Sequence, residues 1–138
     1  MKILIICTGN TCRSQMAEGF LKSMDATLEV FSAGTVAEGK VNPYAVEVML
    51  EKGINISNQN PDSINLYLKD SFDYVITVCD GANESCPAFL GEVKNRLHMG
   101  FQDPAAARGT KEEVLPVYRN VRDQINNAFS EFYKGLTR

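Results

Sequence analysis

Histidine is scarce in this sequence, and closely paired cysteines are absent from it. His98 is the only histidine among 138 residues, and Cys7, Cys12, Cys79 and Cys86 form no Cys-x-x-Cys pair. A structural zinc site needs four such ligands, usually in closely spaced pairs. The sequence therefore predicts no metal cofactor of that kind.

Long apolar stretches and a strong net charge are also missing. The mostly apolar run of residues 1–6 ends at Cys7, whereas a secretory signal needs about 7–15 apolar residues and a spanning helix about 20. The formal net charge of -3 gives no electrostatic reason to bind nucleic acid. We therefore expect a cytoplasmic protein without a membrane or nucleic-acid partner. Cytoplasmic thiols are kept reduced, so its cysteines are better explained as reactive groups than as disulfides.

The pattern of apolar residues predicts one α/β domain over residues 1–138. Four short apolar runs, at residues 2–6, 28–33, 74–78 and 96–99, are typical of buried strands. Helices are predicted at residues 13–24 and 42–52, with a short helical segment at 64–69 and a long helix near the end of the chain. Strands alternating with helices indicate three layers, α/β/α, around a four-stranded parallel sheet.

The last helix has two opposing signals at its start. Thr110 and Glu113 have the spacing of a capping box, which favours a start at that point. Pro116 removes a helical hydrogen bond. We therefore expect the helix to begin later than the capping box.

The most informative segment follows the first strand. It reads Cys-Thr-Gly-Asn-Thr-Cys-Arg-Ser over residues 7–14, and we call it the Cys7 loop. A loop between a strand and a helix points backbone N–H groups into one concavity at the helix N-terminus, which favours tetrahedral oxyanions. The predicted oxyanion-binding residues are Thr8, Gly9, Asn10, Thr11, Cys12 and Arg13.

Within this loop we assign chemical roles to three side chains. Cys7 is the predicted nucleophile, because a helix N-terminus lowers the pKa of a cysteine and so stabilises its thiolate. Arg13 can hold two oxyanion oxygens with its planar guanidinium. Ser14 is placed to donate a hydrogen bond to the Cys7 sulfur. Cys12 is interpreted as structural, since its position need not direct it at the anion.

Asp103 precedes Pro104 in a loop after the fourth predicted strand. Loops at the carboxyl ends of parallel strands gather on one edge of the sheet, where ligands bind. Asp103 can therefore meet the Cys7 loop and act as a general acid that protonates a departing oxygen. An ordinary Asp-Pro turn is the alternative interpretation.

These motifs together resemble the low-molecular-weight protein tyrosine phosphatase superfamily. More closely, the chain resembles the thioredoxin-coupled arsenate reductases that share that fold. The matching segments are CTGNTCRSQMAEG at 7–19, Ser32-Ala33-Gly34, Asn42-Pro43, Ile56-Ser57-Asn58, Cys79 with Cys86, and GFQDPA at 100–105. Phosphatases of this fold usually carry an aromatic residue after Asp-Pro, where this chain has Ala105.

The resemblance implies a three-cysteine mechanism for reducing arsenate to arsenite. Cys7 attacks arsenate, Cys79 then attacks the Cys7 sulfur, and Cys86 resolves the resulting disulfide. Thioredoxin reduces the final Cys79–Cys86 bond, and phosphate or sulfate competes with arsenate. Some relatives bind a potassium ion, and the matching positions here are Asn10, Glu18 and Asp62.

The spacing of Cys79 and Cys86 gives an independent expectation. If the intervening segment were helical, the two Cα atoms would lie about 10 Å apart, whereas a disulfide needs them within about 7 Å. The segment at 80–85 must then change structure when the disulfide forms.

A phosphatase that uses Cys7, Arg13 and Asp103 is the alternative enzyme. A non-catalytic redox sensor is the alternative of another class.

Overall fold

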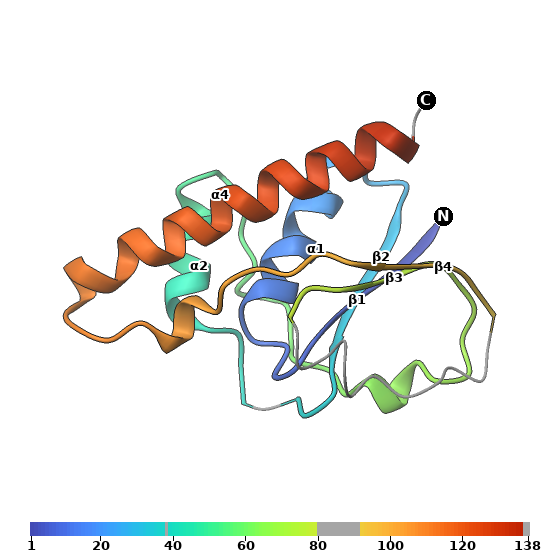
Figure 1. The fold of residues 1–138 in the computed structure, drawn as a ribbon, viewed down its shortest axis with the longest axis horizontal. Helices are drawn as coiled ribbons and strands as arrows, with labels where there is room; N and C mark the ends of the chain where they lie inside the picture. The colour runs from blue at the N-terminus through green and yellow to red at the C-terminus, as the bar shows by residue number, and fades with distance from the viewer. Residues whose placement is uncertain (38, 80–91, 137–138) are drawn as a thin grey trace.

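The protein was examined as a computed structural model that describes residues 1–37, 39–79 and 92–136 (Figure 1). Its strands are β1 (Lys2–Cys7), β2 (Glu29–Gly34), β3 (Phe72–Thr77) and β4 (Val93–His98). Its helices are α1 (Arg13–Met24), α2 (Pro43–Leu50) and α4 (Lys111–Leu136), with two short 3₁₀ helices, η1 (Ile64–Leu66) and η2 (Pro104–Ala106).

The four strands form one parallel sheet in the order β2-β1-β3-β4. β1 lies inside the sheet, and its residues from Ile3 to Cys7 are all buried. A strand covered on both faces needs this continuous apolar sequence. The predicted α/β class with a four-stranded parallel sheet is confirmed.

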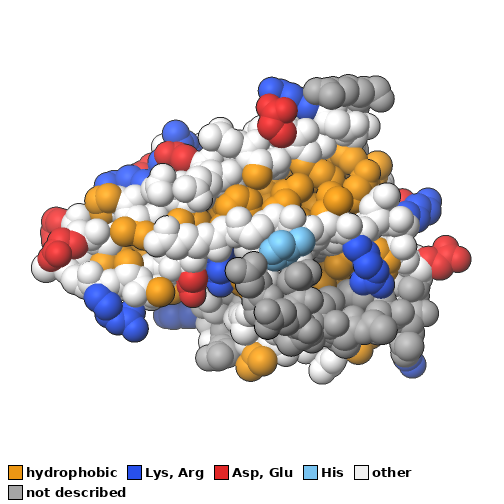
Figure 2. Space-filling model, in the orientation of Figure 1, with side chains coloured by type: hydrophobic (Ala, Val, Ile, Leu, Met, Phe, Trp, Pro, Cys, Tyr) orange, Lys and Arg blue, Asp and Glu red, His pale blue; other side chains and the backbone are white. Residues whose placement is uncertain are grey.

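The three long helices lie on one side of the sheet, and η1 lies on the other (Figure 1). On the helical side, Tyr74 of β3 packs edge-on against Phe132 of α4, with ring centroids 5.0 Å apart. Figure 2 shows hydrophobic side chains gathered along the line where α4 meets the sheet. The core lies between these helices and the strands, and no helix in the described part of the chain is long and apolar enough to span a membrane.

Two predicted boundaries were wrong. α4 begins at Lys111, at the capping box, and contains Pro116. Thr110 N–H donates to Glu113 Oε1, and Glu113 N–H donates to Thr110 Oγ1, each at 3.3 Å. These two bonds outweigh the single backbone hydrogen bond that Pro116 removes. β4 begins at Val93, three residues before the predicted start, because its exposed polar residues pair with β3 along an edge and need no apolar sequence.

The carboxyl ends of the strands lie along one edge of the sheet. β1 runs into the Cys7 loop, β3 runs into Val78 and Cys79, and β4 is followed by the segment that carries Phe101 and Asp103. Phe101 N–H donates to Val78 O at 3.2 Å, which ties this last segment to the end of β3. The parallel topology thus brings together residues that are far apart in the sequence.

Candidate active site

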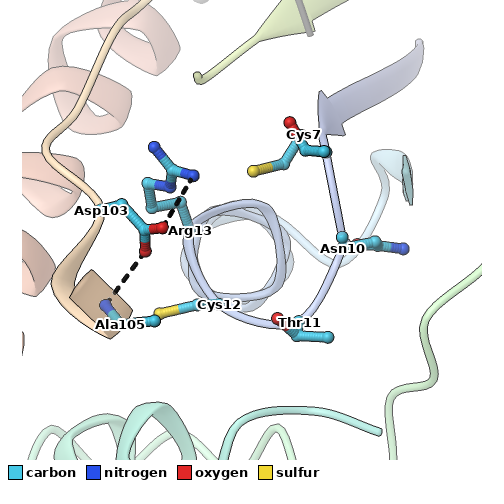
Figure 3. A pocket seen from close by; sticks show the side chains of 9 residues that line it. Cys7, Asn10, Thr11, Cys12, Arg13, Asp103 and Ala105 are labelled. Carbon is cyan, nitrogen blue, oxygen red and sulfur yellow. Dashed lines mark hydrogen bonds and ion pairs between the residues drawn. The ribbon is translucent and has the colours of Figure 1, made fainter. Parts of the chain in front are cut away.

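A cavity of about 260 Å³ opens at this edge of the sheet (Figure 3). All six predicted oxyanion-binding residues line it, together with Cys7, Asp103 and Ala105. The loop after β4 therefore meets the Cys7 loop, as its position after a parallel strand predicts.

Asn10 fixes the shape of the Cys7 loop. Its backbone has φ 55°, in the left-handed region, and its side chain is fully buried. Asn10 Oδ1 accepts hydrogen bonds from Ser14 Oγ at 2.8 Å and from Gln15 Nε2 at 3.0 Å. Gln15 Oε1 in turn accepts a 2.7 Å bond from Gln59 Nε2. These buried amides hold the loop in a conformation that few residues adopt unaided.

The same contacts change the interpretation of Ser14. Its hydroxyl donates to Asn10 Oδ1, so its single proton is not directed at the Cys7 sulfur as we expected. Ser14 supports the loop through Asn10. Sequence reasoning missed Gln15 and Gln59, because an isolated glutamine carries no motif that marks it as part of a buried network.

Gly34, the last residue of β2, packs directly against the loop. A Cβ added there would lie 2.5 Å from Thr8 O and 3.1 Å from Asn10 N. The backbone on either side of this contact is hydrogen-bonded as well, since Thr35 N–H donates to Cys7 O at 3.1 Å. The absence of a side chain at Gly34 lets strand and loop meet backbone to backbone.

Arg13 opens α1 and reaches across the cavity to the loop after β4. Its Nη1 donates to Phe101 O at 3.0 Å, and its Nη2 lies 3.7 Å from Asp103 Oδ2. Its Nε is buried and has no hydrogen-bond partner among the residues that the structure describes. A guanidinium placed in this way keeps donors for an oxyanion at the cavity wall.

Asp103 is half-exposed and faces the cavity from the side opposite Cys7 (Figure 3). Its Oδ1 accepts a 3.0 Å hydrogen bond from Ala105 N–H, which caps η2 and fixes the carboxylate. The carboxylate is therefore both an ordinary turn cap and a group within reach of the Cys7 loop. The geometry suits a general acid.

Cys7 and Cys79 form a thiol pair at the ends of the neighbouring strands β1 and β3. Both are buried and reduced, and Thr8 Oγ1 lies 3.3 Å from Cys79 Sγ. The pKa of Cys7 is raised, first by its hydrogen bond with Cys79 and then by burial, while Arg13 and the Thr8 N–H lower it. The expected lowering of this pKa was therefore wrong, because a second thiol and burial outweigh Arg13 and the Thr8 N–H.

Cys12 lines the cavity but is buried at the start of α1. Burial raises its pKa to about 12, with Asp103 adding to the rise and Arg13 opposing it. Its burial at the start of the helix suits the structural interpretation.

Of the three residues matched to a potassium site, two line one cavity and the third lines another. Glu18 and Asp62 line a second cavity of about 230 Å³, whereas Asn10 lines the first. Glu18 Oε2 accepts from Lys22 Nζ at 2.6 Å, so an ammonium group already supplies positive charge there. Asn10 Oδ1 already accepts two hydrogen bonds. No group of three or more His, Cys, Asp or Glu in the described ranges is arranged for a metal, and the potassium site stays a prediction.

One part of the thiol prediction falls beyond these observations. Cys86 and the segment at 80–85 lie outside the described residues. His98 is not among the residues that line the cavity, and its Nδ1 lies 2.7 Å from Thr77 Oγ1.

Comparison with known proteins gives consistent results. Residues 2–138 match the low molecular weight phosphotyrosine protein phosphatase family. An arsenate reductase from Shouchella clausii is 49% identical over 131 residues, which cover 94% of this chain and 93% of that protein. The structure of an arsenate reductase in the phosphate binding state has a TM-score of 0.80 and 33% identity, with 95% of each chain covered. A low molecular weight protein tyrosine phosphatase from Bacillus subtilis has a TM-score of 0.79 and 28% identity, with 99% of this chain and 97% of that chain covered.

Proposed function

The chain belongs to the low molecular weight phosphotyrosine protein phosphatase family, and we propose that it uses this scaffold to reduce arsenate to arsenite. The observation that carries the proposal is a second thiol beside the oxyanion-binding loop: Cys79 Sγ lies 3.3 Å from Thr8 Oγ1, and Cys79 raises the pKa of Cys7. Phosphoryl transfer needs one nucleophilic sulfur. Removing an oxygen from arsenic with two electrons needs a second thiol within reach of the first.

The first step is a displacement at arsenic. The Cys7 thiolate forms an S–As bond, the As–O bond to one arsenate hydroxyl breaks, and that hydroxyl leaves as water with a proton from Asp103. Arg13 and the N–H groups of the Cys7 loop bear the negative charge of the remaining oxygens. Arsenic is still As(V) at this stage.

The second step moves the electrons. The Cys79 sulfur attacks the Cys7 sulfur, an S–S bond forms, and the electron pair of the S–As bond stays on arsenic. Arsenite leaves as As(III), and two thiols have supplied the two electrons. Thr8 Oγ1, 3.3 Å from Cys79 Sγ, is placed to donate a hydrogen bond to the attacking thiolate.

The third step restores Cys7. By the same exchange chemistry, a Cys86 thiolate attacks Cys79, and Cys7 leaves as a thiolate. A dithiol protein of the thioredoxin type then reduces the Cys79–Cys86 disulfide, in the cytoplasm, where such donors keep thiols reduced. Three cysteines let the enzyme end each cycle with its own disulfide, so no glutathione is needed to resolve it.

The cavity wall favours a small inorganic anion over an aryl phosphate. Ala105 stands beside Asp103, and no aromatic side chain is among the described residues that line the cavity. A phenyl ring would gain little contact there. Phosphate and arsenate have the same shape, so slow hydrolysis of phosphate esters is compatible with this site.

The decisive measurement is arsenate-dependent NADPH oxidation by the purified protein with thioredoxin and thioredoxin reductase. Wild-type turnover that is abolished by each of Cys7→Ser, Cys79→Ser and Cys86→Ser is the expected result. Cys12→Ser is the matched control, and we expect it to retain turnover. Hydrolysis of an aryl phosphate that needs Cys7 alone, with no arsenate-dependent turnover, would instead establish the phosphatase.

A further inference from the structure

Phe101 contacts two parts of the site, and the chemistry above assigns it no role. Its carbonyl oxygen accepts the 3.0 Å hydrogen bond from Arg13 Nη1. Its own N–H donates to Val78 O at 3.2 Å, one residue before Cys79. The backbone of this residue therefore joins the oxyanion-binding arginine to the end of the strand that carries the second thiol.

The aromatic ring keeps that backbone in place. It stacks on Phe129 of α4, with ring centroids 6.4 Å apart and planes 29° apart. Phe129 is fully buried. The ring thus holds an otherwise exposed loop, which runs on to Asp103, against the fixed core of the protein.

The hydrogen bonds of Arg13 indicate what its contact with Phe101 does. Phe101 O accepts the hydrogen bond of Nη1, while Nε is buried and has no partner in the described part of the chain. The Nε and Nη2 hydrogens lie along one edge of the planar guanidinium and match two oxygens of a tetrahedral anion. Holding Nη1 fixes the rotation of the plane, so that the edge with Nε and Nη2, the latter 3.7 Å from Asp103 Oδ2, keeps one orientation at the cavity that Arg13 lines.

We infer that Phe101 is a positioning residue for oxyanion binding. Its ring anchors the loop and its carbonyl orients Arg13. The inference rests on the proposed function only in taking the Cys7 loop as the oxyanion site.

Phe132 provides a matched control. It is half-buried like Phe101, lies 6.2 Å from the same Phe129 ring, and packs on Tyr74. Truncating Phe132 removes comparable packing from the same cluster without touching the loop that holds Arg13. The variants Phe101→Ala and Phe132→Ala therefore separate orientation of Arg13 from loss of core packing.

The experiment is calorimetric titration of each protein with inorganic phosphate, beside its Tm. We expect Phe101→Ala to weaken phosphate binding about tenfold, the effect of losing one well-oriented charge-assisted bond, and Phe132→Ala to leave it unchanged at a similar Tm. Phe101→Leu keeps part of the apolar contact but loses the ring stacking, so its affinity should fall between those of the wild type and Phe101→Ala. Equal weakening in Phe101→Ala and Phe132→Ala, or full affinity in Phe101→Ala, overturns the inference.

A second measurement covers a Phe101→Ala protein that does not fold. Restricted rotation of the Arg13 guanidinium separates its Nη signals in NMR spectra, and Phe101→Leu should reduce this separation while Phe132→Leu preserves it. Equal spectra in the two variants count against the inference. Neither measurement requires turnover, so an absence of arsenate reduction would refute the proposed function and leave this comparison standing.

Discussion

Replacing Gly34 by alanine tests whether the shape of the Cys7 loop controls the chemistry. The added Cβ would lie 2.5 Å from Thr8 O, whereas ordinary contacts begin at 3.4 Å. Strand and loop must therefore separate by about 0.9 Å, and neither can yield by turning a side chain, because both sides of the contact are backbone. We expect a loss of about 1–3 kcal/mol in the free energy of unfolding, the usual cost of overpacking.

The effect on activity should be much larger than the effect on stability. A displacement of about 1 Å in a group that positions a substrate can cost about 100-fold in rate. The assay is thioredoxin-coupled arsenate reduction together with phosphate titration and chemical denaturation.

Gly19→Ala is the control for the same chemical change in a crowded place. Its added Cβ would lie 2.7 Å from Ile56 Cγ2, a side-chain atom away from the loop. This variant should be destabilised to a similar extent and keep its turnover. Normal phosphate binding in Gly34→Ala, or an equal loss of turnover in Gly19→Ala, would show that the packing of β2 against the loop does not control the reaction.

Three further predictions follow from individual contacts. Thr8→Val removes the hydroxyl beside Cys79, so arsenate turnover should fall about tenfold. The rate of Cys7 alkylation should stay the same, and a fall in both rates would place Thr8 in the first step. Cys79→Ala removes the largest cause that raises the pKa of Cys7. The pH midpoint for alkylation of Cys7 by iodoacetamide should therefore move down, and an unchanged midpoint would contradict the interaction between Cys7 and Cys79. Lys22 already neutralises Glu18, so exchanging sodium for potassium should alter neither Tm nor arsenate KM, and a rise in Tm with potassium would indicate a cation site.

The fold and the groups that carry chemistry were predictable because they depend on local patterns. A buried parallel strand, a strand-to-helix loop and an Asp-Pro turn each have a sequence signature, and parallel topology alone brings their ends together. The edge strand β4 was located less well, since its residues are exposed and show no apolar run. Its position is set by pairing with β3, which is a long-range interaction.

The support of the site could not be predicted in the same way. Gln15 and Gln59 meet only because α1 and the segment at 57–62 pack together, and single glutamines occur on any surface. The prediction that the pKa of Cys7 is lowered was wrong for a related reason. A helix N-terminus is visible in the sequence, but the thiol that opposes it comes from a strand about 70 residues away and is seen only in three dimensions.

The effect of Cys79 on the pKa of Cys7 bears on the order of the proposed chemical steps. Two sulfurs in contact cannot both bear a negative charge at low cost, so the site favours one thiolate at a time. In the proposed mechanism, Cys7 bonded to arsenic carries no charge on its sulfur, and the repulsion toward an ionised Cys79 is gone. Cys79 thus hinders the ionisation of Cys7. The bonded Cys7 sulfur no longer hinders the ionisation of Cys79, whose thiolate the second proposed step needs. A phosphatase gains nothing from such a neighbour, whereas a reductase needs a second thiol within reach of the first. We regard the raised pKa of Cys7 as the cost of holding that thiol in place.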